Sequence, residues 1–252
     1  MLTSAPSRLI LSTALALASA SAFAQDAAAP DVYGGGLLVR ADMQPYTDAG
    51  TKVSSMPLLQ VDNRWVKFFA TTLDVKLQES KDSSVFLRAH YADTGYKASD
   101  SAALAGMAER KNSFWLGGKA EWRTSVAQLS GEWLADGSRH SDGQQVKLMA
   151  ETLAHVGPVG IVPRLALVWQ DRKYVDYYYG VSASEARADR SAYAGKSALN
   201  TELGVQLFHK LTPQQSVFLD LSATELGSSI KASPLVDRNW VSAVRAGYLY
   251  RF

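Results

Sequence analysis

The chain has 252 residues, of which 20% are charged and 47% are hydrophobic, with a formal net charge of +2 and no cysteine. The lack of cysteine excludes a disulfide framework and any thiolate-based catalysis or metal binding. The small, mixed charge gives no evidence for or against nucleic acid, so partners have to be inferred from the pattern of the chain.

Residues 1–24 are typical of a secretory signal peptide. Arg8 supplies a basic start, residues 9–20 form an apolar run, and Ala22-Phe23-Ala24 is a small-x-small cleavage site. The apolar run is too short to remain as a membrane anchor. We therefore expect an exported mature chain of residues 25–252, forming one domain, with no nucleic-acid partner. After residue 24 the sequence has no run of about 18 apolar residues, so we predict no helical membrane span.

The mature chain alternates between apolar and polar residues over long segments, which places each set on its own side of a β-strand. Connections between these segments alternate between short and long. Strands of about ten residues can cross the apolar layer of a membrane when tilted. The predicted strands, taken in order, cover residues 31–43, 57–78, 85–91, 114–123, 127–133, 146–155, 164–170, 199–207, 217–224 and 239–252.

The segment 57–78 leaves the strand count open. Its apolar residues keep one odd-numbered phase, from Leu59 through Phe69 to Leu77, which favours a single long strand. A tight turn at Asn63-Arg64 would instead split the segment and add two strands. Ten strands are favoured, and twelve are the alternative.

The last strand defines the fold class. Tyr248, Tyr250 and Phe252 share one face, whereas Arg245 and Arg251 lie on the other. An edge strand of a soluble sandwich would also alternate, but the predicted export and the terminal aromatics favour a lipid-facing strand. We predict an all-β, antiparallel, up-and-down transmembrane β-barrel in the outer membrane of a Gram-negative cell. Tyr248, Tyr250 and Phe252 would act as its membrane insertion signal.

The inward-facing residues carry matched charges of both signs. A small bore buries them, and buried charges persist when they are paired and hydrogen-bonded. We expect ion pairs that fill the lumen, whereas a narrow conducting pore or a catalytic interior is less favoured. The candidates for these pairs are Arg88, Lys119, Glu121, Glu132, Lys147, Glu151, Arg164, Glu202, Asp220 and Arg245.

Catalytic signals are weak. His140 lies in a polar loop with Asp136 and Ser138, and His90 lies on an inward face, so a hydrolase would use one of these histidines with a serine or aspartate. Nothing in the sequence brings such groups together. No metal-ligand spacing and no phosphate-binding glycine loop occurs, so we expect no cofactor and no enzymatic activity.

The segment Tyr177-Tyr178-Tyr179-Gly180-Val181, followed by Ala192-Tyr193, resembles an outer loop of the MipA/OmpV family. The run Ser233 to Arg238, which leads into the last strand, resembles the same family. This resemblance covers nearly the whole mature chain. It implies an outer-membrane barrel in contact with lipid. It also implies a scaffold for murein machinery, because the founding member joins a lytic murein transglycosylase to a bifunctional murein synthase.

The five residues Tyr177, Tyr178, Tyr179, Gly180 and Val181 form either a loop plug in the barrel mouth or a binding patch, since tyrosine provides contact area at low entropic cost. We favour the plug. Murein enzymes would then meet the periplasmic turns near residues 80–82, 157–160 and 210–213. The leading prediction is a non-enzymatic scaffold protein. A narrow channel for small solutes is the alternative, and an outer-membrane hydrolase is less favoured.

Overall fold

The computed structural model describes residues 31–252, so the predicted signal peptide of residues 1–24 lies outside the described part of the chain. The described residues form one antiparallel sheet. Each strand pairs with its sequence neighbours, except that β8 and β9 both pair with β10, and β1 also pairs with β13, which closes the sheet into a barrel. The strands are β1 (Val32–Met43), β2 (Thr51–Asp62), β3 (Val66–Phe69), β4 (Thr72–Glu79), β5 (Ser83–Ala92), β6 (Ser113–Arg123), β7 (Gln128–Asp136), β8 (Gln144–Glu151), β9 (Ala154–Val156), β10 (Val159–Gln170), β11 (Ala198–Lys210), β12 (Gln215–Glu225) and β13 (Trp240–Arg251).

The barrel wall has twelve strand positions, because β8 and β9 both pair with β10 and are two segments of one strand interrupted at residues 152–153. The transmembrane up-and-down barrel is therefore confirmed, with the alternative strand count. The favoured count of ten was wrong. The side chain of Asn63 accepts hydrogen bonds from the backbone amides of Trp65 (2.8 Å) and Val66 (2.9 Å), which builds the turn after β2.

The hairpin of β3 and β4 also changes the side of the wall to which the Phe69 side chain points. In β4, Asp74 is buried inside the barrel while Leu73 and Val75 are exposed outside. Phe69 pairs with Thr72, so it lies on the inner face, and its ring is 6.2 Å from that of Phe218. The unbroken odd-numbered phase of residues 57–78 therefore holds in β2 and β4 but fails in β3, because two turns separate them.

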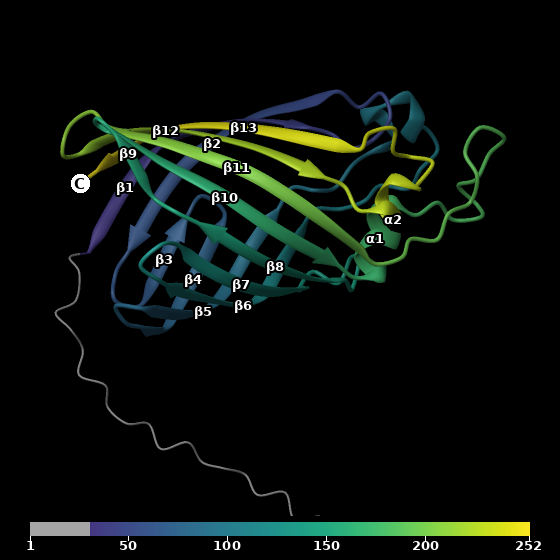
Figure 1. Ribbon diagram of the computed structural model, residues 1–252. Helices are drawn as coiled ribbons and strands as arrows, with labels where there is room; N and C mark the ends of the chain where they lie inside the picture. The colour runs from purple at the N-terminus through teal and green to yellow at the C-terminus, as the bar shows by residue number, and fades with distance from the viewer. Residues whose placement is uncertain (1–30) are drawn as a thin grey trace, which may run out of the picture.

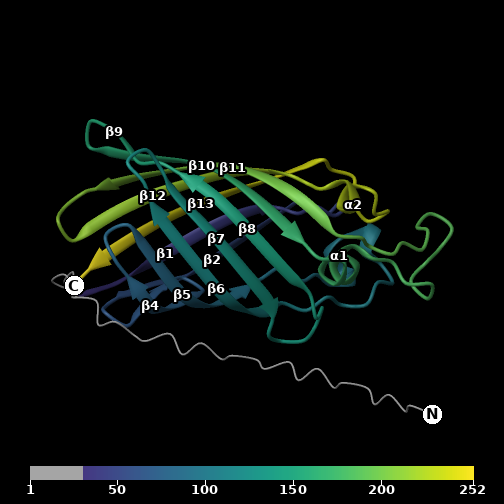
Figure 2. The ribbon, with the colours of Figure 1, turned by 60° about the horizontal axis from the view of Figure 1, so that its bottom comes forward.

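The two ends of the barrel differ in structure. Figures 1 and 2 show the carboxyl terminus at one end and the helices α1 (Arg172–Tyr179) and α2 (Ser228–Lys231) at the other. The helical end also receives the segment 93–112, with the short 3₁₀ helices η1 (Ala98–Asp100) and η2 (Ala102–Leu104). Barrels of this kind have short periplasmic turns and longer external loops, so the helical end is the outer mouth. Among the described residues, no helix is long and apolar enough to cross a membrane.

Aromatic side chains mark both edges of the apolar exterior. Toward the outer mouth the exposed rings are those of Phe114, Trp133, Trp169 and Trp240. At the other end lie the predicted insertion-signal residues: Tyr248 and Tyr250 are exposed on the outside, and Phe252 is 85% exposed. Tyr250 and Phe252 contact each other at 5.6 Å. This spacing of aromatics at both interfaces is the girdle pattern of membrane barrels.

One part of the lumen is apolar, which the sequence analysis did not predict. Leu38, Leu58 and Leu249 are buried together on the inner faces of β1, β2 and β13. Met56, Ala70 and Phe218 pack against them. We call these six residues the lumen apolar cluster. Leu38 and Leu58 escaped notice because the outward neighbours Leu37 and Leu59 are also leucines, so local alternation is blurred.

Gly36 allows β1 to close against β13. A Cβ atom at Gly36 would lie 1.8 Å from the carbonyl oxygen of Tyr248, whereas one at Gly35 would have its nearest contact at 3.8 Å. We expect Gly36→Ala to lower the free energy of unfolding by about 1–3 kcal/mol or more, because backbone has to move. Urea unfolding in lipid vesicles would measure this. Gly35→Ala is the matched control, and equal destabilisation by both changes would contradict the explanation.

Candidate functional site

The aromatic run at residues 177–179 belongs to helix α1, where a loop was predicted. The Asp171 side chain accepts a hydrogen bond from the Tyr174 amide at 2.8 Å and caps the helix start. Tyr174, Val175 and Tyr178 are buried, and their spacing places them on one helical face. That spacing and the capping aspartate were signals for a helix. They were overlooked because the segment lies between two strands.

Helix α1 packs across the outer mouth. Its buried face contacts Trp115 of β6, Leu134 of β7, Ala198 of β11 and Ile230 of α2, which come from different sides of the wall. The rings of Trp115 and Tyr174 are 5.4 Å apart. We call α1 and these partners the mouth cluster. Because the helix is anchored on several strands, it has little freedom to move as a free loop would.

The five predicted plug or patch residues are divided between the mouth cluster and a second apolar cluster of the external loops, described below. Tyr178 is 1% exposed in the mouth cluster, and Tyr177 packs beside it while its hydroxyl accepts the Lys111 amide at 2.9 Å. Tyr179 lies 5.8 Å from Tyr46, ring to ring. Gly180 ends the helix, where a Cβ would lie 2.2 Å from the carbonyl of Asp176. Val181 is buried and pairs with Tyr193.

A second apolar cluster ties the external loops to one another. It contains residues from four separate loops and is distinct from the mouth cluster. Tyr46 and Tyr96 make an edge-on ring contact at 4.6 Å. Burial raises the pKa of Tyr96 to about 12, so this hydroxyl stays protonated at physiological pH. The members of this outer-loop cluster are Tyr46, Tyr96, Leu104, Met107, Val181 and Leu235.

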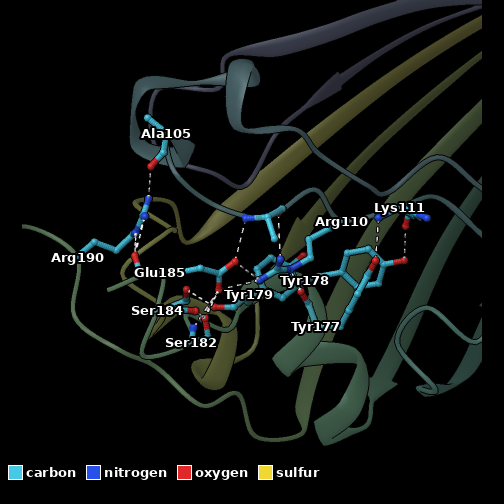
Figure 3. A network of polar contacts seen from close by, with 12 residues as sticks. Ala105, Arg110, Lys111, Tyr177, Tyr178, Tyr179, Ser182, Ser184, Glu185 and Arg190 are labelled. Carbon is cyan, nitrogen blue, oxygen red and sulfur yellow. Dashed lines mark hydrogen bonds and ion pairs between the residues drawn. The ribbon is translucent and has the colours of Figure 1, made fainter. Parts of the chain in front are cut away.

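Arg110 joins the two clusters (Figure 3). Its Nε donates to the carbonyl of Tyr177 at 2.6 Å, and its Nη2 contacts both carboxylate oxygens of Glu185 at 3.0 and 3.1 Å. The guanidinium also lies over the rings of Tyr96 and Tyr177, at 5.8 and 5.6 Å from their centres. Arg190 donates to carbonyls of Ala103 and Glu185. Alternation patterns carry no information on such loop contacts, so the sequence analysis missed these roles.

Glu185 is the acidic centre of this network. Burial alone would raise its pKa, but hydrogen bonds from the amides of Ala108 and Ser182, the Ser182 hydroxyl and the charge of Arg110 outweigh burial and lower the pKa to about 2. A depressed carboxyl pKa stabilises the folded loops above the ordinary pKa of about 4.5.

We expect the loop network to loosen as the pH falls from about 4.5 toward 2, because Glu185 is then protonated and loses its charge-assisted bonds. Hydrogen exchange of residues 180–195, measured as a function of pH in lipid vesicles and compared with the intrinsic exchange rate at each pH, would show lower protection in that window. In Glu185→Gln the acid-dependent step should vanish. A step of the same size in the variant would contradict this assignment.

Inside the barrel, Arg88 of β5 joins two acids. It binds both carboxylate oxygens of Asp74 on β4, at 2.7 and 2.6 Å, and also contacts Glu132 on β7. Lys119 contacts Glu121 at 2.6 Å. Asp74 was not among the predicted members, because it lies in the segment whose strand count was open. Arg88 is thus the centre of one lumen ion-pair group.

A second lumen group lies across β8, β10, β11, β12 and β13. Arg164 contacts Glu202 at 3.1 Å and Asp220 at 2.5 Å. Lys147 supplies a second cation to Glu202 at 3.2 Å, and Arg245 supplies one to Asp220 at 3.3 Å. Each acid here therefore has two cationic partners.

Of the remaining candidates, Glu151 differs from the prediction. It accepts a hydrogen bond from the Gln128 side-chain amide at 3.2 Å, and among residues 31–252 it forms no ion pair. The Gln128 partner lies directly opposite Glu151 in the β7–β8 ladder. A neutral amide can satisfy a carboxylate oxygen without a counter-charge.

His140 lies close to a serine, but its contacts do not suit a general base. Its Nδ1 is 2.9 Å from the carbonyl of Asn112 and 3.2 Å from the Ser113 hydroxyl. A carbonyl only accepts, so Nδ1 carries the proton and has no lone pair for the serine. Ser113 is also fully buried, and the Asp136 carboxylate accepts from Ser138 and Ser141. His90 contacts the Thr72 hydroxyl at 2.9 Å.

A closed sheet with an apolar exterior, charges paired in its lumen and long loops gathered at one mouth defines an outer-membrane β-barrel protein. Its place is the outer membrane. The family model described as MltA-interacting protein MipA matches residues 33–252, and the chain belongs to that family. The resemblance to the MipA/OmpV family is confirmed.

Relatives agree with this membership. The putative outer membrane protein YiaT of Escherichia coli K12 is 28% identical over 224 residues, covering 82% of this chain and 86% of YiaT. The MltA-interacting protein of the same organism is 24% identical over 214 residues, covering 82% of this chain and 85% of that protein. OmpV of Vibrio cholerae is 26% identical over 155 residues, covering 61% and 60%.

Solved barrels are more distant. The NanC porin covers 90% of this chain and 100% of its own, with a TM-score of 0.42 and 12% identity. An outer membrane channel from Pseudomonas putida F1 covers 94% of this chain and 100% of its own, with a TM-score of 0.42 and 11% identity.

Proposed function

We propose that this protein is a non-enzymatic outer-membrane scaffold whose periplasmic turns bind murein-processing enzymes, in particular a murein transglycosylase and a murein synthase. The observation that carries the proposal is the packed outer mouth, where helix α1 is held against strands on several sides. Because helix α1 fills the outer mouth, the periplasmic end is the surface that remains for contact with other proteins. A family relative named MltA-interacting protein supports the same partner class.

The periplasmic end offers a surface of suitable chemistry. Apolar side chains lie exposed at or near the turns, including Val126 (78%), Val156 (66%) and Leu211 (50%). Lys81 and Asp82 are exposed in the β4–β5 turn. Exposed apolar residues rimmed by charges are typical of protein-binding surfaces. These turns lie on the same side as the carboxyl terminus (Figure 1).

The test uses purified protein in nanodiscs and a soluble murein transglycosylase without its lipid anchor. We expect saturable binding by surface plasmon resonance. Changing Val156 and Leu211 together to aspartate should weaken binding by about tenfold or more, as expected when apolar contacts are replaced by charges. The matched control places two aspartates in the outer loops, at Ala183 and Ala188, and should bind normally. No saturable binding by the unchanged protein would overturn the proposal.

A channel for small solutes is a second candidate function, and the charged lumen favours it. Arg164, Lys147 and Arg245 bring three cations to two acids along the inner wall. Such a row of charges is typical of lumens that select ions. Planar bilayer recordings of the unchanged protein decide this candidate: discrete conductance steps support the channel, and a silent bilayer removes it.

A further inference from the structure

The barrel wall has a break in its hydrogen-bonded ladder beside β2. Strand β3 has four residues, whereas a tilted crossing needs about nine to eleven. The hairpin ends at residues 70–71, and β2 pairs with β3 only at Gln60, Val61 and Asp62. The remainder of β2, residues 51–58, has β1 on one side and no strand partner on the other among the described residues.

The sequence is adapted to this edge. The Ala70 amide donates to the carbonyl of Leu59, so the odd-numbered residues of β2 direct their backbone groups away from β1 and toward the break. Pro57 is one of these residues, and it has no amide to leave unpaired. A proline is tolerated in a sheet only where the ladder bond is absent. The break is therefore encoded in the sequence.

The break lies at membrane depth. Through the β1 ladder, Leu59 is in line with Gly35 and Tyr250, and Val53 is in line with Ala41 and Val244. Val53 is 68% exposed and Leu59 is 54% exposed on the outside of the barrel. On the inside, Met56, Leu58 and Ala70 border the break as members of the lumen apolar cluster. Lipid on one side and apolar lumen residues on the other flank this stretch.

A cavity of about 410 Å³ lies at the upper end of the break. Its lining includes Lys52 of β2 and Asp93, which follows β5, and these two form an ion pair of 2.9 Å across the break. The hydroxyl of Tyr96 is buried here and has no hydrogen-bond partner among residues 31–252. An unpaired buried hydroxyl costs free energy, so a bound group that hydrogen-bonds to it would be favoured.

The lining of this cavity selects the chemistry of the head group. Three basic side chains, Lys52, Lys97 and Arg110, face three acidic ones, Asp93, Asp100 and Glu109. A balanced lining gives no net attraction to a charged head, whereas hydroxyl groups donate to the acids and accept from the bases.

A second copy of this chain cannot fill the break with the antiparallel pairing that the rest of the wall uses. Two barrels inserted with the same orientation would present β2 edges that run in the same direction, and a two-fold axis along the membrane normal cannot align them as an antiparallel ladder. The cavity at the upper end of the break is lined by polar side chains, whereas the stretch below it is flanked by apolar side chains on both faces. The occupant needs both an apolar and a polar part.

We propose that the break and the cavity above it bind a single-chain amphiphile with an uncharged, hydroxyl-rich head, such as a glycolipid of the outer leaflet. Its hydrocarbon tail lies along residues 53–59 of β2, and its head occupies the cavity at Tyr96. This site is independent of the periplasmic scaffold surface.

The test uses purified protein in nanodiscs and an alkyl glucoside that carries a photo-reactive diazirine in its tail. Peptide mapping after irradiation is expected to show labelling of residues 51–59 and 68–71 above that of the lipid-facing row at Leu199, Leu203 and Leu207. Excess unlabelled alkyl glucoside should abolish the difference. Labelling spread evenly over all lipid-facing rows would overturn the site.

Two variants separate binding from folding. Tyr96→Phe removes a hydroxyl that has no partner in the described part of the chain, so the fold is retained, and binding of the probe should weaken by about two- to tenfold. Ser55→Trp covers the break. Each methylene group of the probe's tail that can then no longer be buried should weaken binding about fourfold. Leu203→Trp, on the lipid face of β11, is the matched control and should label normally. Unchanged labelling in both test variants would refute the proposal.

A second probe tests the assignment of the head group. A fatty acid with the same diazirine tail carries a carboxylate in place of the sugar. We expect its labelling of residues 51–59 to fall below that of the glucoside. Equal labelling by both probes would overturn the assignment of an uncharged head.

Discussion

Arg88→Met is expected to be the most destabilising single change in the lumen. It removes the one cation in contact with Asp74 and Glu132 in the described part of the chain, and Asp74 is 5% exposed. Breaking a buried ion pair from one side costs about 3–5 kcal/mol, because the remaining charges lose their partner. Urea unfolding in lipid vesicles, followed by tryptophan fluorescence, would measure the loss.

Arg164→Met provides the comparison. Its acids keep other partners, since Lys147 still contacts Glu202 and Arg245 still contacts Asp220. We expect a smaller loss than for Arg88→Met. Adding Asp74→Asn and Glu132→Gln to Arg88→Met should recover most of the stability, because no buried charge is then left. Equal losses for the two arginine variants, or no recovery in the triple variant, would show that the ion pairs do not dominate.

Excision of helix α1 is expected to open the barrel to ions. Residues Gln170 and Ala198 pair directly, so a short Gly-Ser linker in place of residues 172–196 can join β10 to β11 without strain. The excision removes Tyr174, Val175 and Tyr178 from the mouth. Planar bilayer recordings should change from few or no steps to regular conductance steps, because the helix that packs across the mouth is lost.

The control deletes residues 98–109 from the neighbouring external loop, which contribute to the outer-loop cluster but not to the mouth cluster. We expect conductance to remain low in that variant. If the α1 excision variant folds, as judged by heat-dependent mobility on gels, and remains silent, then α1 does not close the mouth.

The alternation of residues in the sequence predicted the wall of the barrel well, because lipid and lumen impose opposite demands on successive side chains. Segment 31–43 matches β1 (Val32–Met43) closely, and the loop at residues 93–112 lies between the predicted strands 85–91 and 114–123. Residues that favour tight turns were harder to interpret from the sequence. Asn63 builds a turn inside a segment whose phase is nearly unbroken, so the phase gave the wrong strand count there.

The mouth was predicted only in outline. Tyr177, Tyr178 and Tyr179 were singled out, but the helix that carries them depends on the Asp171 cap and on contacts with Trp115 and Ile230, residues far apart in sequence. Contacts of this kind depend on the closed barrel, which brings these residues together. The same holds for the Arg110–Glu185 pair. Local alternation cannot report them, because loops have no periodic environment.

The lumen ion pairs have a consequence for assembly. Arg88 of β5 reaches over β6 to Glu132 of β7, and Arg164 of β10 reaches over β11 to Asp220 of β12. Such contacts form only when three successive strands have the correct sliding offset. A one-residue slip would turn these charges toward lipid. The charged interior thus discriminates against misaligned closure, and selects one shear for the finished cylinder.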